Sequence, residues 1–73
     1  MILNERIFNL IKERKITQYR LAKDLAISDG LISDWKNGRS SPTSERLIKL
    51  AKYFNVSTDY LLGLTDNPKP HYE

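Results

Sequence analysis

Polar side chains suited to hydrogen bonding gather in one short stretch of the chain. Asp29, Ser33 and Asp34 supply two carboxylates, which accept hydrogen bonds, and a hydroxyl, which both donates and accepts. The residues needed for covalent catalysis are scarce, because the 73 residues include no cysteine and the one histidine, His71, is the third residue from the C-terminus. Cysteine-dependent catalysis, histidine-based triads and clustered metal sites are therefore excluded or strongly disfavoured. We expect a binding protein without a cofactor, not an enzyme.

The charge balance favours a polyanionic partner. The chain has 12 basic and 9 acidic residues and a net charge of +3. Up to Leu64 the count is 11 basic and 7 acidic, so the surplus belongs to the part expected to fold. A small basic domain is consistent with nucleic acid as a partner, although many domains of this charge bind none. No apolar run approaches the roughly 20 residues of a membrane span, and no signal-peptide pattern opens the chain, so we expect a cytoplasmic protein.

These polar residues need rigid elements to position them, and the apolar spacing predicts helices. Leu3, Ile7, Leu10 and Ile11 recur every three to four residues, which is the period of an amphipathic helix. Asn4 is the expected N-cap of this first helix, because a side-chain oxygen at that position accepts a hydrogen bond from a free backbone N–H group. Glu13 to Lys15 form its polar exit.

Four further helices are predicted after N-cap residues at Thr17, Ser28, Thr43 and Ser57. Glycines after the third and fifth helices, Gly38 and Gly63, are suited to the left-handed conformation that ends a helix. The buried face of the fourth helix is expected to hold Leu47, Ile48, Leu50, Ala51 and Phe54. No segment alternates with period two, so the prediction is all-α. Residues 65–73 carry two prolines and no apolar periodicity, and are expected to form a flexible tail or the start of a linker.

The second and third predicted helices are joined only by Ala26 and Ile27. Two short helices with so tight a turn must cross at a large angle. This is the helix-turn-helix arrangement, in which the second helix of the pair can enter the DNA major groove. Leu21, Ala22 and Leu25 are expected to pack against Ile32 and Trp35 and to hold the pair rigid.

Motifs spaced along the chain agree with one family in a single register. They are Ile16-Thr17-Gln18, Leu21-Ala22, Ile27-Ser28, Ile32-Ser33, Trp35, Gly38, Pro42, Leu47, Ala51, Val56-Ser57 and Thr58-Asp59-Tyr60-Leu61-Leu62-Gly63. On these residues the chain resembles the Cro/cI-type (XRE-like) helix-turn-helix family of phage and bacterial transcriptional regulators. The resemblance covers about residues 3–64. It implies a compact five-helix, lambda-repressor-like DNA-binding domain over 1–64, with the helix-turn-helix at about 17–37. It further implies double-stranded operator DNA as partner and binding as a homodimer.

The resemblance also implies roles for individual residues. The positions that face base edges are Asp29, Gly30, Ser33 and Asp34. The expected phosphate contacts are Thr17, Gln18, Lys36, Asn37, Arg39 and Ser41, with Ser44, Arg20 and Lys23 as weaker candidates. Part of the apolar C-terminal region is implied as a dimer contact, with Tyr60, Leu61 and Leu64 as its candidates. Chemistry adds that an aspartate in the groove can accept a hydrogen bond from cytosine N4 and disfavours wrong sequences by its charge.

Two positions depart from the family pattern. Ala26 occupies the turn position where the family usually has glycine, and a left-handed alanine there should cost about 1 kcal/mol. Lys36 stands where many members carry a glutamate that pairs with an arginine of the first helix, and Ile11 stands at the partner position. We therefore expect that ion pair to be absent here.

Structural roles compete with some of these assignments. Asp29 in a first helical turn also stabilises the helix dipole, and Asn37 is also a plain C-cap residue. Trp35 is interpreted as a core residue that holds the third helix, not as a platform for stacking bases. At the level of function, the leading interpretation is a sequence-specific transcriptional regulator, with a repressor favoured. The alternative is a protein-interaction module, such as an antitoxin-like or adapter domain, which the acidic third helix slightly favours.

Overall fold

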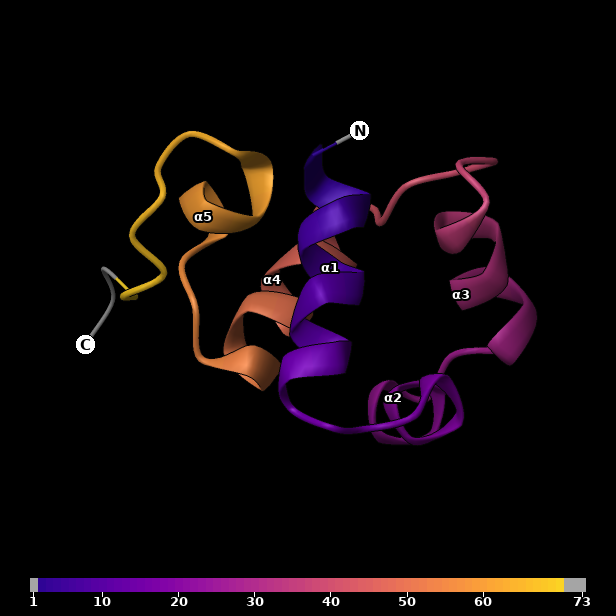
Figure 1. Ribbon diagram of the computed structural model, residues 1–73. Helices are drawn as coiled ribbons and strands as arrows, with labels where there is room; N and C mark the ends of the chain where they lie inside the picture. The colour runs from indigo at the N-terminus through magenta and orange to yellow at the C-terminus, as the bar shows by residue number, and fades with distance from the viewer. Residues whose placement is uncertain (1, 71–73) are drawn as a thin grey trace.

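Five α-helices follow one another along the chain (Figure 1), and the computed structural model describes residues 2–70. They are α1 (Ile2–Glu13), α2 (Gln18–Leu25), α3 (Asp29–Lys36), α4 (Ser44–Phe54) and α5 (Thr58–Leu62). No strand occurs in residues 2–70, so the all-α prediction is confirmed. None of the helices in this part of the chain is long and apolar enough to cross a membrane.

The N-caps predicted for the last four helices are confirmed. The side-chain oxygen of each cap residue accepts a hydrogen bond from the backbone N–H three residues later, at 2.9 to 3.4 Å: Thr17, Ser28, Thr43 and Ser57. The C-cap residue is left-handed in α2 (Ala26), α4 (Asn55) and α5 (Gly63), and Gly38, directly after the C-cap of α3, also has a positive φ, as predicted. Because each cap is a local interaction, it fixes the ends of its helix independently of the rest of the fold.

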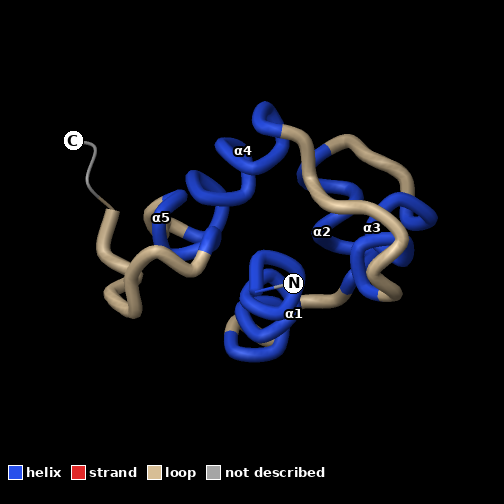
Figure 2. The backbone as a smooth tube through the Cα atoms, turned by 90° about the horizontal axis from the view of Figure 1, so that it is seen from above, coloured by secondary structure: helices blue, strands red, loops and turns tan. Residues whose placement is uncertain are grey.

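The helices pack around α1, which Figure 1 shows in the centre of the molecule between α5 and α3. Viewed from above in Figure 2, α2 and α3 lie on one side of α1 and α4 and α5 on the other. The core is formed by buried side chains of all five helices, among them Ile7, Leu21, Ile32, Trp35, Leu50, Phe54 and Leu61. One expected core residue is absent from it: Ile48 is 49% exposed, because the buried face of α4 follows Leu47, Leu50, Ala51 and Phe54.

The predicted cap residue Asn4 has a different role. α1 begins at Ile2, so Asn4 lies inside the helix, and its side chain is buried in line with Ile7. Its Nδ2 donates to the backbone oxygens of Trp35 (2.8 Å) and Ser40 (3.2 Å), and its Oδ1 accepts from the Ser41 hydroxyl (3.3 Å). The expectation of an N-cap at Asn4 is therefore wrong. The amide instead ties α1 to the end of α3.

The segment after α5 is attached to the body. The Arg6 guanidinium donates to the backbone oxygens of Tyr60 (2.5 Å) and Thr65 (2.6 Å), and it pairs with the Asp66 carboxylate at 2.9 Å. The backbone N–H of Ser57 donates to the Pro68 oxygen at 3.0 Å. Within the stretch expected to be a flexible tail or the start of a linker, Thr65, Asp66 and Pro68 thus make contacts with the body of the domain. Residues 71–73, which that prediction also included, lie outside the described part of the chain.

Candidate nucleic-acid interface

The turn between α2 and α3 sets the angle at which α3 is presented. Ala26 adopts the left-handed conformation, with φ 55° and ψ 44°, where the family resemblance places a glycine. The backbone N–H of Ile27 then donates to the Ala22 oxygen at 3.0 Å and closes the end of α2. Alanine accepts this conformation at a cost of about 1 kcal/mol, so the surrounding packing must offset it.

That packing is supplied by the inner faces of the two helices. Leu21 and Ile32 are fully buried, and Ala22 and Trp35 are 5% and 1% exposed. Trp35 is thus a core residue and is not available to stack on a base, in agreement with the sequence interpretation. Its indole N–H has no hydrogen-bond partner within residues 2–70. With the inner faces buried, the polar residues of α3 are left on the outside.

The outer face of α3 carries the four positions expected to face base edges. Asp29 and Gly30 are exposed, and Ser33 and Asp34 are partly exposed. A Cβ atom built at Gly30 would meet only the Ser28 hydroxyl, at 4.0 Å, so no neighbour requires glycine there. The structure therefore brings these four residues together on one open surface.

Two of these residues already have partners on the same surface. The side-chain amide of Gln18 donates to the Ser33 hydroxyl at 2.9 Å, across the crossing of α2 and α3. The Arg39 guanidinium lies 3.5 Å from the Asp34 carboxylate, with side chains 71% and 42% exposed. Each bond joins a residue expected to contact phosphate to a residue expected to face a base.

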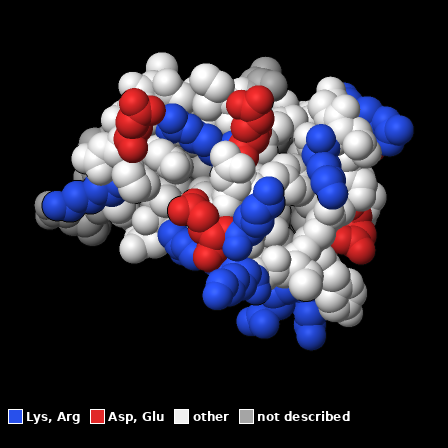
Figure 3. All heavy atoms as spheres, in the orientation of Figure 1, with Lys and Arg blue, Asp and Glu red and all other residues white. Residues whose placement is uncertain are grey.

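The remaining expected phosphate contacts surround this face. Thr17, Lys36 and Asn37 are exposed, and Asn37 is also the C-cap of α3, so its two interpretations are compatible. Ser41 is exposed, but its hydroxyl donates to Asn4. On the face shown in Figure 3, Lys and Arg side chains gather along the lower edge, over α2 and the end of α1 as Figure 1 places them. A basic border therefore flanks the acidic outer face of α3.

A contact that the sequence did not predict fixes α2 to α4. The Tyr53 hydroxyl donates to the Asp24 carboxylate at 2.5 Å, and Arg20 pairs with the same carboxylate at 2.9 Å. The hydrogen bond from Tyr53 lowers the pKa of Asp24, and Arg20 lowers it further. The same hydrogen bond to Asp24 raises the pKa of Tyr53. Arg20, a weaker candidate for phosphate, is thereby engaged within the protein.

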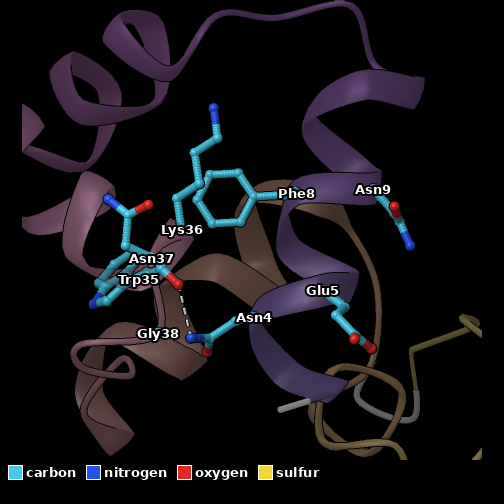
Figure 4. Close-up of a pocket in the computed structure, with 8 residues that line it drawn as sticks. All are labelled: Asn4, Glu5, Phe8, Asn9, Trp35, Lys36, Asn37 and Gly38. Atoms are coloured by element: carbon cyan, nitrogen blue, oxygen red, sulfur yellow. Dashed lines mark hydrogen bonds between the residues drawn. The ribbon is translucent and has the colours of Figure 1, made fainter.

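An open groove of about 580 Å³ separates α1 from the end of α3 (Figure 4). In that view the Asn4 side chain reaches across to the Trp35 backbone. Ile11 and Lys36 line a neighbouring hollow of about 490 Å³, so the two family ion-pair positions lie near each other. Ile11 carries no charge, and Lys36 forms no ion pair in the described part of the chain. No cluster of metal-binding side chains is found in residues 2–70.

The three residues expected at a dimer contact differ in how far they are buried. Leu61 is fully buried in the core, so the expectation that it contacts a partner is wrong. Leu64 is 74% exposed, and the half-buried Tyr60 ring lies 4.2 Å beneath the Arg6 guanidinium. Ile2 packs so closely against Gly63 that a Cβ atom there would lie 2.8 Å from its Cγ2. Ile2 and Leu62, 49% and 45% exposed, were not among the predicted residues but share this end of the molecule.

Comparison with known proteins decides the family. Residues 4–67 match the family described as the helix-turn-helix domain. The chain belongs to this helix-turn-helix family. The match spans all of α2 to α5 and nearly all of α1, so the resemblance inferred from the spaced motifs is confirmed.

Relatives within the helix-turn-helix family come from bacteria and phages. The uncharacterized HTH-type transcriptional regulator YobD of Bacillus subtilis (strain 168) is 35% identical over 69 residues, or 94% of this chain and 62% of that protein. Repressor protein C2 of Salmonella phage P22 is 38% identical over 61 residues, or 84% of this chain and 28% of that protein. The chain thus spans less than two thirds of the length of these relatives.

A solved structure shares the fold. It is the crystal structure of the P22 c2 repressor protein in complex with synthetic operator 9T in the presence of Tl+. The two chains are 36% identical and superpose with a TM-score of 0.75, over 84% of this chain and 92% of the other. The helix-turn-helix fold inferred from the sequence is confirmed.

Proposed function

We propose that this protein is a transcriptional regulator that binds specific sequences of double-stranded DNA and inserts α3 into the major groove. The observation that carries the proposal is the match in fold and sequence to a repressor whose structure was solved in complex with a synthetic operator. The open outer face of α3 supports it, because its three polar residues and Gly30 are exposed or partly exposed within residues 2–70. This is a binding role and not an enzymatic one.

We assign one set of residues to the phosphates and another set to the bases. Phosphate contacts fix the register of the protein on the duplex, and base contacts choose the sequence. An aspartate of α3 would accept a hydrogen bond from cytosine N4, and Ser33 can pair with several bases. The base-facing residues are Asp29, Gly30, Ser33 and Asp34, and the phosphate-facing residues are Thr17, Gln18, Lys36, Asn37 and Arg39. Ser41 is the weakest member of the second set, since its hydroxyl is used by Asn4.

We further propose that two copies bind a near-palindromic site. Each would place one α3 in successive major grooves about 34 Å apart. The apolar patch of Ile2, Tyr60, Leu62 and Leu64 is the candidate contact between the copies, since these side chains lie at one end of the molecule and are at least partly exposed. Bound there, the dimer would act as a repressor by excluding polymerase, in the cytoplasm of a bacterial host.

Salt dependence tests the proposal against the alternative of a protein-interaction module. Each phosphate contact releases a counterion, so log K should fall linearly with log salt concentration by about 0.9 for each contact. Five phosphate contacts per subunit predict a slope of about −4.5 for one bound copy and about −9 for two. We expect such a slope in fluorescence anisotropy titrations of a labelled duplex. A folded chain that binds no duplex even at low salt would contradict the proposal and favour a protein partner.

A further inference from the structure

The outer face of α3 contains a pairing that the proposed function leaves unexplained. Arg39, a candidate phosphate contact, is held by Asp34, a candidate base contact, at 3.5 Å. Gln18 is held by Ser33 in the same way, at 2.9 Å. In both pairs one member faces phosphate and the other faces bases. Free protein therefore presents fewer unpaired donors to DNA than its residue types suggest.

We propose that Asp34 masks Arg39 until a matching base pair releases it, so that Asp34 determines specificity through Arg39 as well as through the base. This inference rests on the proposed function. On a matched site, a cytosine amino group donates to the Asp34 carboxylate, and Arg39 is free to bind a phosphate. On a mismatched site no amino group replaces Arg39, and the guanidinium stays with Asp34. A wrong base then costs two contacts and not one.

The chemistry of the two side chains supports this exchange. The Asp34 carboxylate has about four acceptor sites, so a cytosine amino group competes with Arg39 for its charge and not for a last acceptor site, and the five N–H donors of Arg39 suit a phosphate as well as a carboxylate. Their pair is exposed to water, so it is weak enough to break when a better partner is offered. Asp29 offers a contrast on the same face, since no ion pair links it to a basic residue within residues 2–70.

The inference predicts how charge removal changes non-specific binding. In Asp34→Asn the carboxylate charge is lost, Arg39 is free, and binding to a random-sequence duplex gains one phosphate contact. The slope of log K against log salt should steepen by about 0.9, so affinity should fall about 3.5-fold further between 50 and 200 mM salt than in the original chain. Affinity for the cytosine-containing operator should fall, because Asp34 no longer accepts from cytosine N4.

A double-mutant cycle separates masking from simple repulsion. Asp34→Asn, Arg39→Gln and the double variant are titrated against one labelled random-sequence duplex and against the duplex enriched by library selection. Masking predicts that Arg39→Gln changes random-duplex binding little by itself and abolishes the gain produced by Asp34→Asn. Asp29→Asn is the matched control, and its effect should be the same with and without Arg39. Circular dichroism checks that every variant keeps the helical fold.

The outcomes separate the inference from the function on which it rests. Loss of the Asp34→Asn gain in the double variant supports masking. A gain of equal size with and without Arg39 overturns it, because Asp34 then repels phosphates directly. No gain in Asp34→Asn also overturns it. In both contrary cases operator binding by the original chain would leave the proposed function standing. A folded original chain that binds neither duplex would overturn the function and the inference together.

Discussion

Within residues 2–70, three residues other than glycine adopt the left-handed backbone conformation: Lys15, Ala26 and Asn55. Asparagine tolerates this conformation, but alanine and lysine gain nothing from it. Ala26 matters most for function, because it forms the turn that orients α3 against α2. The left-handed conformation that alanine disfavours thus occurs in the turn that sets the orientation of α3.

Replacing Ala26 with glycine should therefore stabilise the fold. Relief of the left-handed strain outweighs the extra entropy of glycine in the unfolded chain, and we expect the free energy of unfolding to rise by about 0.5 kcal/mol in urea denaturation. Ala22→Gly is the matched control, because Ala22 is buried inside α2 and should be destabilised by about 1 kcal/mol or more. A less stable Ala26→Gly variant would show that the turn is not strained.

Gly30 separates stability from binding at a single position. Its Cβ position is open in the free protein, so Gly30→Ala should raise the free energy of unfolding by about 0.5–1 kcal/mol through helix propensity alone. In the groove, the added methyl group should hold α3 away from the bases. Affinity for the selected operator should fall about tenfold, or about 1.4 kcal/mol. Equal operator affinity in both proteins would remove Gly30 from the interface.

At the scale of elements, the helix starts could be predicted from the sequence, but the side-chain hydrogen bonds that join one helix to another could not. A Ser or Thr cap accepts a hydrogen bond from an N–H group three residues away, so Thr17 and Ser28 can be recognised as caps from the neighbouring sequence. Asn4 contacts residues more than 30 positions distant, and Arg6 more than 50. One signal for Asn4 was present, since it falls on the same helical face as Ile7 and Ile11. The interpretation of Asn4 as an N-cap did not use this position on the buried face of the helix.

The bond between α2 and α4 makes stability depend on pH at both ends of the range. The pKa of Asp24 is lowered from its ordinary value of 3.8, so its contribution is present above that pH and is lost as pH falls through the lowered pKa. The pKa of Tyr53 is raised from 10.0, so its contribution is present below that pH and is lost as pH rises through the raised pKa.

Tyr53→Phe should remove most of this dependence, because the hydroxyl that both shifts share is gone. The melting temperature should be lower than that of the original chain between about pH 5 and pH 9, and the difference should shrink toward both extremes. Tyr19→Phe is the control, because Tyr19 is 67% exposed and its hydroxyl makes no hydrogen bond within residues 2–70. A difference that is constant from acid to alkaline pH would contradict the assignment.

At the scale of the whole molecule, the outer face of α3 that we propose to contact DNA and the apolar patch lie on different elements. Helical periodicity places the four α3 positions named by the resemblance on one exposed or partly exposed face, and their contact with bases stays a prediction. The sequence pattern did not distinguish the buried leucine of the C-terminal region from the exposed one. Leu61 is 0% exposed because it lies on the inner side of α5, whereas Leu64 lies two residues past the end of α5 and is 74% exposed.

Leu64→Asp should weaken dimer binding without unfolding the domain. A charge at this exposed position costs the core nothing, but it opposes burial of the patch of Ile2, Tyr60, Leu62 and Leu64 between two copies. Affinity for a two-half-site operator should fall at least tenfold, while affinity for a single half-site should be unchanged. Ile48→Asp, on the outer side of α4, is the matched control and should bind both duplexes as the original chain does.

The central claim is that α3 reads a specific DNA sequence, and selection of bound duplexes from a random-sequence library tests it most directly. The 73-residue chain is used at near-physiological salt. The account predicts enrichment of an inverted repeat whose half-site centres are about one helical turn, or 34 Å, apart, with cytosine at a position lost in Asp34→Asn. Failure of a folded chain to enrich any sequence would contradict the claim.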